Sequence, residues 1–161
     1  MLARMLDAPP RHAILHNAMH MITDQLSVGN IMDAEDPSPV IGTLLFVAEE
    51  LTMTPASWVD YHYIPFRECA KADPAKLMEA VQWLESRAPT ERKLVCCRAG
   101  MGRSVSVVMA YLCCVEGKSY DEVLKLVMTR HPGAMPLPNL QVAIEQVRQL
   151  RRAKPPRRNG S

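Results

Sequence analysis

The fold of this chain is decided by the stretch Val95-Cys96-Cys97-Arg98-Ala99-Gly100-Met101-Gly102-Arg103-Ser104, which joins an apolar run to a helical pattern through a tight turn. The turn combines the Cys97 thiol, two glycines and the Arg103 guanidinium. Backbone N–H groups in such a turn can surround a phosphate while the sulfur faces the phosphorus. Cys97 could instead be a small buried side chain at a strand end. The glycines and the arginine together favour the phosphate-binding interpretation.

The predicted helix after this loop explains how the thiol could ionise. A helix that begins near Arg103 directs its positive end at Cys97, and the guanidinium adds a full charge. Both favour the thiolate, which is the nucleophilic form of cysteine. We expect Gly100 and Gly102 to adopt positive φ angles, because a closed cradle of N–H groups requires them.

Arg103 and Ser104 have separate expected roles in the same loop. The planar guanidinium can hold two phosphate oxygens, over which charge spreads in the transition state. Ser104 is placed to donate a hydrogen bond to the sulfur, which makes the sulfur a better leaving group. The expected phosphate-binding residues are Arg98, Ala99, Gly100, Met101, Gly102 and Arg103.

Cleavage of a phosphoester also requires a proton donor for the leaving oxygen. The acidic candidates upstream of the loop are Asp60, Glu68, Asp73 and Glu79. Asp60 precedes a predicted strand, Asp73 is placed to cap a helix, and Glu79 lies inside that helix. Glu68 follows a strand within a loop and is the geometric choice. Its alternative role is an ion pair with Arg67 or Lys71.

Composition indicates one globular domain. The chain has 161 residues, of which 48% are hydrophobic and 22% charged, and a formal net charge of +2, which does not predict nucleic-acid binding. The N-terminus lacks the pattern of a secretory signal, and no apolar run has the length of a membrane span. Five clustered cysteines without a CxxC pair fit neither a disulfide framework nor structural zinc. We therefore expect a cytoplasmic protein.

Strand and helix patterns alternate along the chain. Apolar runs predict strands at 26–28, 44–48, 61–64 and 93–96, the third ending at Pro65. Helical spacing predicts helices after the caps Asp73 and Ser119, from Arg103 to residue 115, and after residue 138. His131 precedes a helix-breaking Pro-Gly pair and is expected to be structural or solvated. The pattern predicts an α/β fold with a mainly parallel central sheet flanked by helices, which binds ligands beyond the carboxyl ends of the strands.

These residues resemble the dual-specificity branch of the cysteine-dependent protein tyrosine phosphatases, from about Ile22 to Val147. The residues Cys97 to Ser104 match the signature loop of that family. The segment Ile64-Pro65-Phe66-Arg67-Glu68, with Ala72-Asp73 after it, is similar to the general-acid loop, and Pro138-Asn139 to the start of the last helix. The resemblance implies the protein tyrosine phosphatase fold over residues 21–150, between an N-terminal arm (1–20) and a basic C-terminal tail (151–161).

The resemblance implies hydrolysis of phosphotyrosine and phosphoserine or phosphothreonine on proteins, without metal or cofactor. Cys97 would form a phosphocysteine while Glu68 protonates the leaving group, and Glu68 would then activate water. The expected partner is a phosphorylated protein or peptide, not nucleic acid or membrane. Two alternatives are a phosphatase of phosphoinositides, nucleotides or phosphorylated sugars, and a phospho-binding module with weak turnover. Two departures from the family bear on the rate of turnover: Cys96 stands where the family has a histidine, and Glu68 where it has an aspartate.

Overall fold

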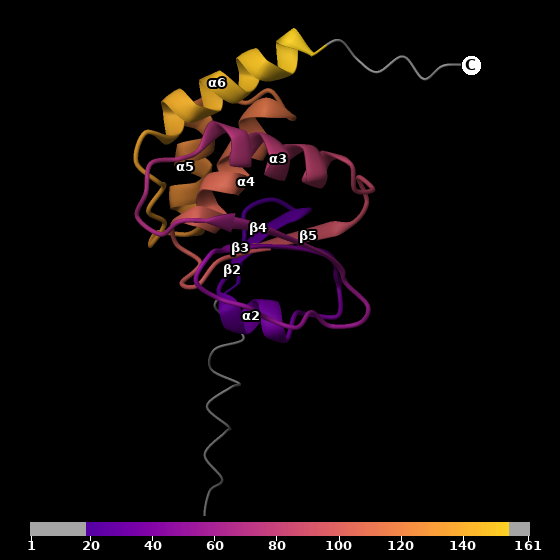
Figure 1. Cartoon of the computed structure of the whole chain (residues 1–161). Coiled ribbons are helices and arrows are strands. Elements are labelled where there is room, and N and C mark those ends of the chain that lie inside the picture. The colour runs from indigo at the N-terminus through magenta and orange to yellow at the C-terminus, as the bar shows by residue number, and fades with distance from the viewer. Residues whose placement is uncertain (1–18, 155–161) are drawn as a thin grey trace, which may run out of the picture.

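A central five-stranded sheet organises the molecule, for which a computed structural model describes residues 19–154 (Figure 1). The strand order is β1-β2-β5-β3-β4; β1 pairs antiparallel with β2, and the other neighbours are parallel. The strands are β1 (His20–Met21), β2 (Leu26–Gly29), β3 (Ile41–Ala48), β4 (Asp60–Phe66) and β5 (Arg92–Cys96). The predicted α/β class with a mainly parallel sheet is therefore confirmed.

Helices cover both faces of this sheet. Figure 1 shows α2 on one face and the other helices on the opposite face. The helices are α2 (Ile31–Glu35), α3 (Pro74–Glu85), α4 (Arg103–Cys114), α5 (Tyr120–Arg130) and α6 (Leu140–Ala153). The predicted caps are confirmed: Asp73 accepts a hydrogen bond from the N–H of Ala75 at 2.9 Å, and Ser119 forms a capping box with Glu122.

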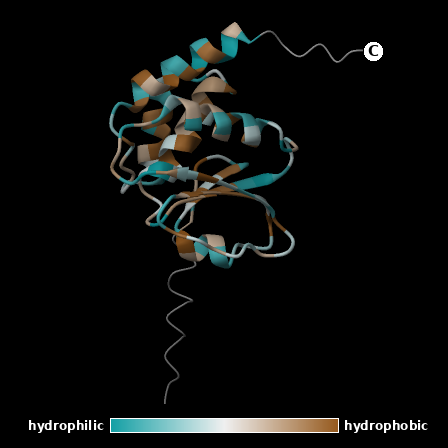
Figure 2. Ribbon diagram, in the orientation of Figure 1, coloured by the Kyte–Doolittle hydropathy of each residue, from teal (hydrophilic) through white to brown (hydrophobic). Residues whose placement is uncertain are grey.

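The core lies where the central strands meet the helices. Figure 2 shows apolar residues gathered along these strands. Nearly all of β3 is buried, as its continuous apolar sequence predicts for a strand covered on both faces. α4, which follows the loop, is buried at Arg103 and along the next seven residues. The loop is therefore held between two buried elements.

The structure corrects the predicted end of β4. Pro65 does not end this strand, which continues to Phe66. β4 is the last strand of the sheet. A proline lacks an N–H donor, and an edge strand tolerates that loss because one of its sides has no neighbouring strand. This extension brings Phe66 level with the end of β3, where it contributes to the site described below.

The ends of the domain also differ from the expected boundaries. His20, expected in the N-terminal arm, belongs to β1, and α6 continues through Ala153 into the expected tail. Arg151 donates hydrogen bonds to both carboxylate oxygens of Glu85, at 2.7 and 3.0 Å, and so ties α6 to the end of α3. Leu150, near the end of α6, is 46% exposed. The rest of the expected arm, apart from Met19, and residues 155–161 lie outside the described part of the chain.

Among residues 19–154, no helix has both the length and the apolar character needed to cross a membrane.

Candidate active site

The loop lies at the carboxyl end of β5 and leads directly into α4. Cys97 follows the last residue of β5, and Arg103 is the first residue of α4. The positive end of the helix dipole therefore points into the loop. This position is where parallel α/β sheets bind ligands, as predicted.

The carbonyl groups of the loop are tied to structure around it. Arg98 O accepts from the N–H of Ile31 at 3.2 Å, Gly100 O from Nε2 of His131 at 2.8 Å, and Met101 O from the N–H of Met135 at 2.7 Å. In a trans peptide the C=O and the following N–H point in opposite directions. Outward carbonyls therefore turn the N–H groups of residues 99, 101 and 102 toward the inside of the loop. Such a set of amides can bind an oxyanion.

The two loop glycines are needed for different reasons. Gly100 has φ of 72°, and a Cβ there would lie 2.8 Å from the carbonyl carbon and oxygen of Gly29. Its predicted positive φ is confirmed, and close packing on Gly29 adds a second constraint. Gly102 has φ of −115°, so the positive φ predicted for it is wrong. A Cβ on Gly102 would instead lie 3.2 Å from Met135 O, because the 131–138 segment packs closely on the loop.

The two adjacent cysteines have different environments. Cys97 lines the site cavity, and its Sγ lies 3.3 Å from Oγ of Ser104, as expected for a hydroxyl that supports the sulfur. Cys96 is fully buried on β5. Burial, the Asp33 carboxylate and the neighbouring Cys97 raise the pKa of Cys96 well above its usual value. Cys96 therefore remains a neutral thiol, and Cys97 is the thiol available to a ligand.

Arg103 is held by the carboxylate of Glu50, a residue that the sequence pattern did not single out. Its Nη1 and Nη2 donate to the two oxygens of Glu50, both at 2.6 Å, and Nη1 also donates to Phe66 O at 3.1 Å. These hydrogen bonds lower the pKa of Glu50 to about 2, and Glu50 raises the pKa of Arg103. Arg103 is 3% exposed, and these hydrogen bonds give its guanidinium a fixed orientation as well as a fixed charge.

This arrangement leaves one edge of the guanidinium for a ligand. Arginine has five N–H groups, and Glu50 and Phe66 engage three of those on Arg103. The two others, on Nε and Nη2, lie parallel along one edge. That edge has the geometry for two oxygens of a phosphate. Glu50 follows the apolar strand β3 by two residues, and its position at the carboxyl end of a central strand is the signal that could have identified it.

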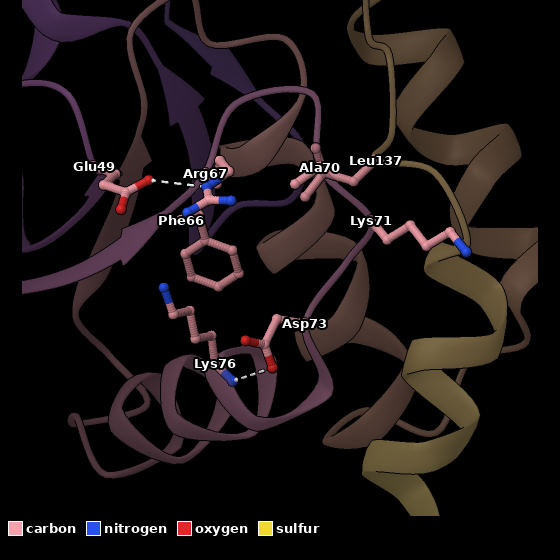
Figure 3. A pocket seen from close by; sticks show the side chains of 8 residues that line it. All are labelled: Glu49, Phe66, Arg67, Ala70, Lys71, Asp73, Lys76 and Leu137. Atoms are coloured by element: carbon pink, nitrogen blue, oxygen red, sulfur yellow. Dashed lines mark hydrogen bonds and ion pairs between the residues drawn. The ribbon is translucent and has the colours of Figure 1, made fainter.

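Only one of the four candidate acids lines the Cys97 cavity. Glu68 does so, and its charge also acts on Arg103. Asp60 pairs with Arg87, and Glu79 lies 3.7 Å from His62. Asp73 lines a neighbouring pocket, where its carboxylate accepts from the N–H groups at the start of α3 (Figure 3). The structure thus brings together Cys97, Arg103, Ser104 and Glu68.

The cavity itself is mostly apolar. Its volume is about 410 Å³, and it is lined by Glu68, Cys69, Cys97, Ala99, Met101, Gly102, Arg103 and the segment 135–138. Four of the six expected phosphate-binding residues are in this lining. Arg98 and Gly100 are not: Arg98 is exposed, and Gly100 packs behind the loop against Gly29.

Known proteins are similar to this chain in both sequence and structure. The chain is 28% identical over 142 residues to mouse dual specificity protein phosphatase 15, an alignment that covers 81% of this chain and 57% of the mouse protein. The chain is 27% identical over 149 residues to the rat protein of the same name, an alignment that covers the same shares of the two chains. The chain thus spans 57% of the length of these curated relatives. No protein-family model matches it.

Solved structures share the fold. Human DUSP28 superposes with a TM-score of 0.73 at 20% identity, over 84% of this chain and 96% of the human chain. The crystal structure of DUSP15 superposes with a TM-score of 0.67 at 24% identity, over 85% of this chain and 97% of that chain. The chain is therefore similar to dual-specificity phosphatases in its sequence, and to their solved structures in its fold.

Proposed function

We propose that this protein hydrolyses phosphomonoesters on phosphotyrosine and phosphoserine or phosphothreonine residues of proteins, through a phosphocysteine on Cys97. The observation that carries the proposal is the meeting of the Cys97 sulfur, the open edge of Arg103 and Glu68 in one cavity. Homology to dual-specificity phosphatases supports the same reaction.

In the first step, the Cys97 thiolate attacks the phosphorus and the bond to the substrate oxygen breaks. Glu68, in its carboxylic acid form, gives its proton to that oxygen. The inward N–H groups of the loop and the open edge of Arg103 hold the equatorial oxygens. Because Glu50 already orients the guanidinium, little reorganisation accompanies the build-up of charge.

In the second step, water attacks the phosphocysteine and the phosphorus–sulfur bond breaks. The Glu68 carboxylate takes a proton from the attacking water. Ser104, 3.3 Å from the sulfur, donates a hydrogen bond to the departing thiolate. The products are inorganic phosphate and the original thiolate, so the cycle needs no cofactor.

The test is hydrolysis of p-nitrophenyl phosphate by wild type, Cys97→Ser and the matched control Cys96→Ser. We expect Cys97→Ser to abolish turnover, because serine is a far weaker nucleophile here, and Cys96→Ser to retain most of it. Phosphate release from phosphotyrosine, phosphoserine and phosphothreonine peptides then tests the substrate class. Equal activity in wild type and Cys97→Ser would refute the mechanism.

A phospho-binding module with weak turnover is the second candidate. The observation that favours it is Cys96, a neutral buried thiol where the family has a histidine that assists ionisation of the nucleophile. Tight binding of phosphopeptides by wild type with negligible phosphate release would establish this function instead.

A further inference from the structure

A side chain, rather than the backbone, holds the central carbonyl of the phosphate loop. The Nε2 of His131 lies 2.8 Å from Gly100 O. The carbonyls of Arg98 and Met101 are held by backbone N–H groups. The Gly100 contact is thus the one of these three that a side-chain substitution can remove.

The contact controls the direction of an amide that faces the ligand. The peptide between Gly100 and Met101 is planar and trans, so anchoring its C=O on one side fixes its N–H on the other. Gly100 has φ of 72° and no side chain of its own to restrain the peptide that follows it. The contact with His131 supplies such a restraint from outside the loop.

The His131 ring is itself rigidly placed. His131 caps α5 through its N–H to Val127 O at 2.7 Å, and only 6% of its surface is exposed. Its ring stacks on that of His20 in β1, with centroids 3.8 Å apart and an interplanar angle of 12°. Burial and the His131 ring lower the pKa of His20, so the stacked partner is uncharged at neutral pH. A carbonyl can only accept, so Nε2 of His131 must carry the hydrogen.

We propose that His131 is a positioning residue for the phosphate loop: its Nε2–H anchors Gly100 O and thereby aims the Met101 N–H at the bound oxyanion. The catalytic part of this role rests on the proposed function. The binding part does not, because any tetrahedral oxyanion would use the same amide. His131 touches neither the sulfur nor the substrate, and acts through the loop.

The experiment measures tungstate affinity by calorimetry for wild type, His131→Leu and His131→Gln. Both variants lose the stacked ring, but only glutamine retains an N–H donor that can reach Gly100 O. We expect His131→Leu to weaken binding about tenfold, the size of one lost hydrogen bond, and His131→Gln to regain most of it. His62→Ala is the control, because His62 also stacks on an aromatic ring, that of Trp83, away from the loop. We expect His62→Ala to bind tungstate with the same affinity as wild type.

Stability measured by urea unfolding separates positioning from a general structural role. Leucine and glutamine variants of similar stability but different affinity support the inference. Equal affinity of His131→Leu and wild type, or equal weakening in both variants, overturns it. If the variants do not fold, the tautomer of His131 in the wild-type protein, read by long-range ¹H–¹⁵N NMR, decides: an Nε2–H tautomer supports the anchor and an Nδ1–H tautomer overturns it.

The same series separates this inference from the proposed function. A wild-type protein that binds tungstate but hydrolyses no phosphoester refutes the proposed function, while the affinities of the two variants still decide the role of His131. A wild-type protein that binds no tungstate overturns both.

Discussion

Glu50 and Glu49 are neighbours in the chain with opposite consequences for the site. Glu50 holds Arg103 with two hydrogen bonds of 2.6 Å, whereas Glu49 makes a looser, exposed ion pair with Arg67 at 3.7 Å. The first contact is buried on the arginine side and sets the orientation of a group that the chemistry requires. The second lies in water, where such pairs contribute little.

We therefore expect Glu50→Gln to lower kcat/KM for p-nitrophenyl phosphate by about 100-fold, because a misaligned catalytic group can cost that much. Glu49→Gln, one residue away with the same change of charge, should stay within about twofold of wild type. Steady-state kinetics on the three proteins checks this prediction. Equal losses in both variants would mean that net charge, not the orientation of Arg103, matters.

Glu68 and Asp73 provide the second comparison between single residues. Glu68 lines the Cys97 cavity, and Asp73 caps α3. If Glu68 is the general acid, Glu68→Gln should lower turnover by about 100-fold for substrates with poor leaving groups, such as phenyl phosphate. The loss should be smaller for p-nitrophenyl phosphate, whose leaving group needs less protonation.

Asp73→Asn is the control, because asparagine can still cap a helix. Its rates should follow wild type across the same series of leaving groups. A leaving-group dependence in Asp73→Asn that is absent from Glu68→Gln would transfer the acid role to Asp73.

At the scale of elements, the loop between β5 and α4 is shaped by what surrounds it. The end of β2 and the start of α2 support it from one side: the Cys97 N–H donates to Gly29 O at 3.3 Å, and the Ile31 N–H donates to Arg98 O. The segment after α5 supports it from the other, through Met135 and His131. The loop is thus preorganised by two other segments, distant in sequence, and does not depend on its own residues alone.

Gly100 and Gly117 allow this packing to be measured. Both have positive φ, of 72° and 69°, but a Cβ on Gly100 would collide with the Gly29 backbone, while a Cβ on Gly117 has no neighbour within 4 Å. Gly117→Ala should cost about 1 kcal/mol of unfolding free energy, the strain of the left-handed conformation. Gly100→Ala should cost about 2 kcal/mol more because of the clash.

Urea unfolding of the two variants measures this difference. A Gly100→Ala protein as stable as Gly117→Ala would show that the loop yields easily, contrary to preorganisation.

For the whole molecule, the Glu50–Arg103 pair links stability to pH. The ordinary pKa of a glutamate is 4.5, and the contact with Arg103 lowers that of Glu50 to about 2. Between these values the unfolded chain binds a proton that the folded protein does not, so stability rises with pH in this window. The contribution of Glu50 is complete above about pH 4.5 and is lost as the pH falls toward 2.

Wild type should therefore exceed Glu50→Gln in unfolding free energy at pH 5, and this margin should shrink by pH 3. Urea unfolding at the two pH values measures it, and other titrating groups cancel because both proteins carry them. A margin that does not change with pH would contradict the ionised pair.

The local features of the chain were predictable from its sequence, because each depends on residues close together along it. The apolar runs predicted the strands, Asp73 and Ser119 predicted helix starts, and the spacing of Cys97 and Arg103 predicted the loop. Each signal acts within a few residues, through backbone geometry or capping hydrogen bonds. The prediction that β4 ends at Pro65 was wrong, because a strand tolerates a proline when it lies at the edge of the sheet, as β4 does.

The tertiary structure alone decided which distant groups meet. Glu50 contacts Arg103 across 53 positions of sequence, and His131 contacts Gly100 across 31. It also decided that Glu68 lines the cavity while Asp73 does not. No spacing in the sequence encodes these pairings, because they follow from the parallel strands ending at one edge and from the packing of α5 and its following segment against the loop. Sequence determined the chemistry that is present; packing determined which groups can act together.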